Sequence, residues 1–128
     1  MEAHVATALG CVVVDLETGD AELVDDHPPT GGDADVSLPL LIAADQVGAR
    51  VVALVKRRPP LMLSDDGGQT WRETGGGLPA GAAIAIHADD PDRLLYASES
   101  RLYLSEDGGR FWRVLDPELI GIAAVAFS

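Results

Sequence analysis

The segment Lys56-Arg57-Arg58 is the only basic cluster in an acidic chain, and it is the first place to look for chemistry. The guanidinium fork of arginine can hold a carboxylate or a phosphate through two parallel hydrogen bonds, and lysine adds a compact positive charge. The alternative is a solvated turn in which these cations pair with nearby acids. We therefore treat the cluster as a candidate ligand site, with the solvated turn left open.

The other chemically active side chains lie far apart in the sequence. His4, His27 and His87 lack the short spacings of metal-binding histidines, and Cys11 lies in an apolar run typical of a buried, inert thiol. His87 is followed by the acidic run 89–92, which is either a cation site or an acid-capped turn. We predict no metal and no cofactor, and leave the cation at this run open.

The charge balance excludes several classes of partner. Nine Lys and Arg face 21 Asp and Glu, a formal net charge of -12, which repels nucleic acid and anionic lipid. Apolar residues make up 47% of the chain, but no apolar run approaches the roughly 20 residues of a membrane helix. The start of the chain lacks the basic residues of a secretory signal. We expect a soluble, cytoplasmic protein, with export left open.

The elements that position these residues follow from a repeat. The segment SDDGGQTW, residues 64–71, returns 41 residues later as SEDGGRFW, residues 105–112, and a weaker copy spans residues 12–22. The third unit contains four short apolar or alternating runs, GAAIAIHA, RLLYAS, RLYLS and RFWRVL, and no window predicts a helix. Four strands in about 41 residues are typical of one blade of a β-propeller.

The repeated segment predicts a tight hairpin with a structural role. The aspartate can accept backbone N–H groups, the second glycine can take positive φ, and the serine hydroxyl can bond locally. The tryptophan that follows can wedge between neighbouring blades. The residues assigned this role are Ser64, Asp66, Gly68, Thr70, Trp71, Ser105, Asp107, Gly109 and Trp112.

The pattern S-x-D-x-G-x-T-W resembles the Asp-box, or BNR repeat, of sialidase-like β-propellers, and is similar to repeats of sortilin-type receptors and photosystem II assembly factors. The first of the two clear copies matches fully, whereas Phe111 replaces the threonine in the second. The first unit keeps only Asp15, Glu17 and Gly19. The resemblance implies that the Asp-box is structural and lies on the face away from the ligand site.

Counting strands predicts that one chain is half of a ring. Residues 1–128 form a single domain: about 3–26 supply strands B to D of a first blade, and about 36–75 and 78–116 are complete blades. Residues 121–128 are then an unmatched inner strand A. Because propellers need four to eight blades, we predict a homodimer with six blades, in which each C-terminal strand completes the first blade of the other chain. A fragment of a longer protein or a higher assembly is the alternative.

In such a propeller, the B-to-C turns and D-to-A connections share the face that binds ligands. The connection 25–35 is the longest on this face, and long loops on a rigid scaffold are where binding residues collect. The candidate ligand-binding residues are Lys56, Arg57, Arg58, Glu99, Arg101 and His27.

Two functions of different classes remain. We favour a non-catalytic module that recognises a protein, a peptide or a small anionic ligand through these loops. The alternative is a minimal sialidase-like glycoside hydrolase whose site forms only in the dimer, with Arg57, Arg58 and Arg101 as part of an arginine triad. Tyr96 and Tyr103 lie in predicted strands and no acid and base pair is recognisable, so no catalytic residue is assigned and enzyme activity is left open. An assembly or stability factor is a third possibility.

Overall fold

The chain is all-β, with three four-stranded antiparallel sheets, and the predicted fold class is confirmed at that level. The computed structural model describes residues 1–32 and 34–128. Sheet 1 has the order β12-β1-β2-β3. Its strands are β12 (Ala124–Phe127), β1 (Glu2–Thr7), β2 (Gly10–Asp15) and β3 (Ala21–Val24).

The other two sheets are each a continuous stretch of chain. Sheet 2 has the order β4-β5-β6-β7, with β4 (Leu41–Val47), β5 (Arg50–Val55), β6 (Leu61–Ser64) and β7 (Arg72–Thr74). Sheet 3 consists of β8 (Ala83–Ile86), β9 (Leu94–Ala97), β10 (Leu102–Ser105) and β11 (Arg113–Val114). Among residues 1–32 and 34–128, no helix has the length and apolar character that crossing a membrane requires.

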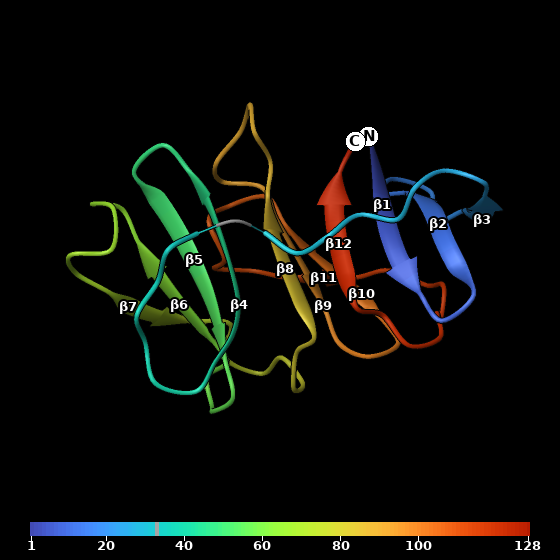
Figure 1. Ribbon diagram of the computed structural model, residues 1–128. Coiled ribbons are helices and arrows are strands. Elements are labelled where there is room, and N and C mark those ends of the chain that lie inside the picture. The colour runs from blue at the N-terminus through green and yellow to red at the C-terminus, as the bar shows by residue number, and fades with distance from the viewer. Residues whose placement is uncertain (33) are drawn as a thin grey trace.

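The three sheets stack face to face, with sheet 3 in the middle (Figure 1). Side chains alternate across each strand, so that in β9 Leu95 packs with sheet 1 whereas Leu94 and Tyr96 pack with sheet 2. Every residue of β8 and β9 is buried, because sheet 3 has a neighbour on both sides. The inner strands β4, β8 and β12 follow one another across the middle of the molecule.

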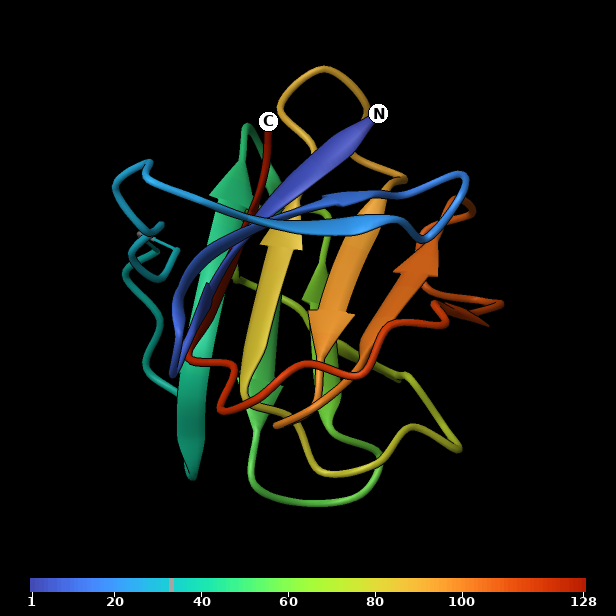
Figure 2. The same ribbon diagram turned by 90° about the vertical axis from the view of Figure 1, so that its right-hand side faces the viewer.

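The C-terminal strand pairs within its own chain, which corrects the predicted exchange between two chains. Strand β12 is antiparallel to β1, with Val125 opposite Val5 and Ala124 opposite Ala6. Both ends of the chain therefore lie side by side, as Figure 2 shows from the side of sheet 1, and the Ser128 N–H donates to the Glu2 carbonyl at 3.0 Å. The free edge of β1 was the expected site for this strand, but the strand that fills it comes from the same molecule.

The repeated hairpins contain the hydrogen bonds that the motif predicts. Asp66 Oδ1 accepts the backbone N–H groups of Gln69 and Thr70, at 3.0 and 2.9 Å, and its Oδ2 accepts the Thr70 hydroxyl at 2.6 Å. The Ser64 hydroxyl donates to Asp66 and accepts the Gly68 N–H, and Gly68 has a φ of 97°. The second copy repeats this network without the threonine bond, because Phe111 contributes only its N–H.

The two tryptophans after these hairpins lie in different surroundings. Trp112 packs against the cluster between sheets 2 and 3, with its ring 6.0 Å from that of Tyr96. Trp71 is at the corresponding place on sheet 2, where no further sheet stands, and it lines a hollow with Val51 and residues 35–37. The predicted wedge between sheets is therefore present for Trp112 alone.

The connection from β3 to β4 takes the place of a fourth sheet. Val51, Ala53 and Val55 point away from sheet 3 and are nonetheless buried. The segment 34–40 passes over this side of sheet 2, as Figure 1 shows to the left of β5. Residue 33, within the long connection 25–35 of the sequence prediction, lies outside the described residues. The segment covers an apolar sheet face that would otherwise be exposed.

The position of β12 predicts a sharp contrast between two substitutions in the same segment. Val125 is 3% exposed and packs toward sheet 3, whereas Ala123 is exposed. Val125→Asp buries an unpaired carboxylate and should lower the free energy of unfolding by about 3 kcal/mol or more. Ala123→Asp, the matched control, should change it by less than about 1 kcal/mol. Chemical denaturation measures both, and equal effects would contradict the pairing of β12 in sheet 1.

The Asp66 network predicts a dependence of stability on acid. The Thr70 hydroxyl and N–H, together with the Ser64 hydroxyl, hold the pKa of Asp66 well below its ordinary value of 3.8. This carboxylate therefore contributes stability that is present above about pH 4 and is lost as the pH falls toward the pKa of the folded state.

Replacing the carboxylate should remove this contribution. Asp66→Asn should lower stability at neutral pH and flatten the loss of stability between about pH 5 and pH 2, measured by urea denaturation across that range. Asp25→Asn removes the same charge from an exposed site without these hydrogen bonds and is the control. An unchanged acid profile in Asp66→Asn would show that the network does not stabilise the fold.

Candidate functional site

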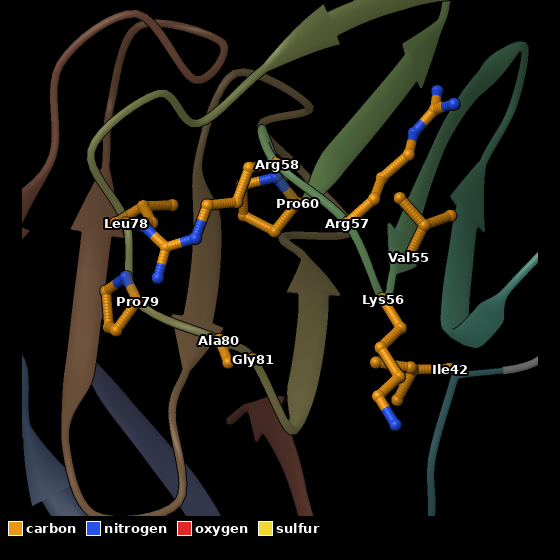
Figure 3. A pocket seen from close by; sticks show the side chains of 10 residues that line it. All are labelled: Ile42, Val55, Lys56, Arg57, Arg58, Pro60, Leu78, Pro79, Ala80 and Gly81. Carbon is orange, nitrogen blue, oxygen red and sulfur yellow. The ribbon is translucent and has the colours of Figure 1, made fainter.

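The basic cluster lines a hollow between sheets 2 and 3. The hollow has a volume of about 220 Å³ and forms where the β5–β6 turn meets the connection from β7 to β8. Figure 3 shows it from close by. Its lining residues are Lys56, Arg57, Arg58, Ile42, Val55, Pro60, Leu78, Pro79, Ala80 and Gly81. The sequence predicted the three cations at this place but not the apolar wall beside them.

The three cations point in different directions. Arg58 extends across the hollow toward Leu78 and Pro79, and Lys56 extends beside Ile42 (Figure 3). Arg57 is turned away, and its Nη2 lies 3.9 Å from Glu73 Oε1. Within residues 1–32 and 34–128, neither Lys56 nor Arg58 has a carboxylate within ion-pair distance. As far as the described residues go, the cluster thus divides into one paired cation and two without an acidic partner.

Backbone hydrogen bonds hold the turn that carries these side chains. The Val55 N–H donates to the Pro60 carbonyl at 2.8 Å, which closes the β5–β6 turn. The Lys56 N–H donates to the Leu40 carbonyl at 2.9 Å, which ties the turn to the start of β4. Proline at two positions of the turn restricts its backbone further. The cations therefore project from a fixed backbone.

Tyr96 supports the opposite wall of the hollow. Its hydroxyl donates to the Pro79 carbonyl at 2.5 Å, and burial raises its pKa to about 12. A side chain at Gly81 would come within 2.4 Å of the same hydroxyl, so only glycine allows this close approach. The phenol is therefore neutral at physiological pH and holds the connection 78–81 against sheet 3.

The remaining predicted site residues do not line this hollow. Arg101 Nη1 donates to the Asp116 carbonyl at 3.5 Å, and the Glu99 carbonyl accepts the Ile122 N–H at 2.9 Å. Both belong to the β9–β10 turn, which is bound to the segment leading into β12. His27 is exposed in the β3–β4 connection. The structure thus places Lys56, Arg57 and Arg58 along one hollow and Glu99, Arg101 and His27 outside it.

Within one chain, the residues considered for a sialidase-like site are not gathered at one place. Arg57 and Arg58 line the same hollow but point in different directions, and Arg101 contacts the Asp116 carbonyl instead. Tyr96 is fully buried with its hydroxyl already bonded, and Tyr103 packs against its ring at 6.0 Å. Neither tyrosine is positioned as an exposed nucleophile in this chain.

The region of His87 is held by local bonds. His87 Nδ1 accepts the Asp89 N–H at 3.1 Å, and Asp90 and Asp92 lie near Arg93 and Arg50. No group of three or more His, Cys, Asp or Glu side chains in the described part of the chain is placed to hold a metal ion.

Sequence reasoning missed Ile42, and it placed the connection 74–81 on the ligand face without naming any residue of 78–81 as part of the site. A signal existed for the segment, because it joins two repeat units on the face that carries the basic turn. Ile42 had no such signal. Comparison with family models, with curated proteins and with solved structures finds no match. The site is therefore interpreted from its own geometry.

Tyr96 gives a test of how the wall is held. Tyr96→Phe loses the bond to Pro79 and should lower the free energy of unfolding at pH 7 by about 1 kcal/mol. In the wild type, stability should fall between about pH 10 and pH 12, because the phenol ionises in the unfolded chain but not in the folded one. Tyr96→Phe should show a shallower fall in urea denaturation over this range. An equal fall in both proteins would show that the phenol ionises freely in the folded state.

Proposed function

We propose that the chain is a non-catalytic binding module that holds an anionic group of a protein, a peptide or a small ligand between Lys56 and Arg58. The observation that carries this proposal is that Lys56 and Arg58 share one hollow and have no carboxylate partner among residues 1–32 and 34–128. Among the described residues, four of the nine Lys and Arg side chains form ion pairs, namely Arg50, Arg57, Arg72 and Arg93.

The electrostatics of the hollow favour an added anion. The guanidinium of Arg58 offers several N–H donors in a plane, and Lys56 offers a mobile ammonium group on the other side. A charge-assisted hydrogen bond contributes about 1.5–3 kcal/mol, more than a neutral one. A hollow that is open to solvent and has two such donors supports binding in the millimolar range for a small anion, and tighter binding for a ligand with further contacts.

The six-bladed ring of two chains stays a prediction. The stacking of three sheets and the repeat of 41 residues support a blade-like architecture. Because β12 is paired within its own chain, two copies would join by stacking the outer side of sheet 1 on sheet 2, where the segment 34–40 now lies. The mass of the particle in solution decides between one chain and two.

The proposed site is tested by titrating the protein with acetate and with inorganic phosphate. The backbone amide signals of residues 56–58 and 79–81 should shift in NMR spectra, with dissociation constants in the millimolar range. The double variant Lys56→Gln, Arg58→Gln should weaken this binding about tenfold or more, because both donors are lost.

Arg110→Gln is the matched control, since it removes one exposed arginine from the distant β10–β11 hairpin. Its binding should equal that of the wild type. Shifts that persist in the double variant, or that map to other parts of the chain, would exclude the proposed site.

A further inference from the structure

The wall of the hollow is mostly apolar. Seven of its ten lining residues are Ile42, Val55, Pro60, Leu78, Pro79, Ala80 and Gly81, and none of them carries a charge. A ligand that offered only an anionic group would leave this wall in contact with water. A ligand that also carries an apolar chain would bury it and gain from the removal of apolar surface from water.

A β-bulge exposes Ile42 at the hollow. The pairing of β4 with β5 shifts register between Leu41 and Ala43. The regular alternation of buried and exposed side chains is therefore interrupted at Leu41 and Ile42. Both are exposed, Ile42 by 45% of its surface, and only Ile42 lines the hollow. Bulges that re-aim a side chain occur preferentially beside functional sites. The regular strand β8 of sheet 3 has no such irregularity.

The apolar residues are physically tied to the cationic turn. Leu40 has a φ of 60°, which is uncommon for leucine, and its side chain is 60% exposed. Its carbonyl accepts the Lys56 N–H, so the apolar and cationic parts are held at a constant separation. Backbone positions of this kind cluster at ligand sites.

The size and charge of the hollow limit the ligand further. At about 30 Å³ per water-sized group, a volume of about 220 Å³ holds roughly seven such groups. This is enough for one carboxylate and a short alkyl chain. Beside an apolar wall, a carboxylate monoanion is favoured over a phosphate dianion, because the dianion costs more to desolvate and needs more hydrogen-bond donors.

Ile42 at the bulge shares one hollow with Lys56 and Arg58, which have no ion pair within the described part of the chain. From this arrangement, we propose that the ligand of this hollow is a monocarboxylate with an apolar chain. The carboxylate lies between the two cations, and the chain lies along Ile42 and the Leu78–Pro79 wall. This inference rests on the proposed function and specifies its ligand class.

The test is a series of linear carboxylates titrated into the full chain, from acetate through butanoate to hexanoate, followed by NMR. The dissociation constant should fall about fourfold per added methylene, as expected for burial of each group. 1-Hexanol should bind more weakly than hexanoate, and the double variant Lys56→Gln, Arg58→Gln should abolish that difference.

Ile42→Ser should flatten the dependence on chain length without changing the binding of acetate. Ile42→Thr is a second variant that keeps the β-branched side chain, and amide spectra check the fold of both. Ile120→Ser is the matched control, because Ile120 is 61% exposed and does not line the hollow; its series should equal that of the wild type.

The possible failures are distinct. If acetate and hexanoate bind equally at this hollow, the apolar chain is not recognised and this inference is overturned, whereas the proposed function stands. If hexanol binds as tightly as hexanoate in the wild type, the role of the cations is overturned. If no member of the series binds, both proposals are overturned.

Discussion

Sheet 3 buries both of its faces, and the remainder of the molecule is arranged to satisfy that requirement. Four-stranded sheets of this size are too small to be stable alone and need an apolar partner on at least one side. Sheets 1 and 2 supply these partners from opposite sides. Hydrogen bonds between neighbouring sheets fix their relative positions. The Asp45 carboxylate of sheet 2 accepts the Ile86 N–H of sheet 3, and Arg113 of sheet 3 donates to the Leu16 carbonyl, next to sheet 1.

A stack of three sheets leaves two outer sides, and the chain covers them differently. The segment 34–40 lies over the outer side of sheet 2, where residues 35–37 line a hollow together with the buried Val51. The outer side of sheet 1 carries small side chains such as Ala6 and Ala124, with His4 bonded to Ser128. Terminal units of stacked architectures commonly need such caps. A cap made from its own connection lets one chain cover an apolar face without a partner.

The hollow is a consequence of how neighbouring sheets meet. The basic turn belongs to sheet 2, whereas the wall of residues 78–81 leads into sheet 3 and is held there by Tyr96. Stacking therefore brings a charged turn against an apolar connection at one end of the interface. The direction of Arg57 follows from its neighbours, because its guanidinium contacts Glu73 and Met62, whereas Arg58 has no such contact within the described residues.

The amino-acid sequence by itself determined the features that depend on short-range contacts. Alternating apolar runs and glycine-rich turns predicted strands in every unit, and the bonds of Ser64 and Asp66 were predictable because they span at most four residues. The tertiary structure decided what depends on distant contacts. The hydrogen bonds of β12 are chemically the same whether β1 belongs to its own chain or to another, so only the stacking of sheet 1 on sheet 3 selects the partner. The tertiary structure likewise decided that Ile42 lines the same hollow as Lys56 and Arg58. The bulge that places Ile42 there has no recognisable pattern in the sequence of the strand.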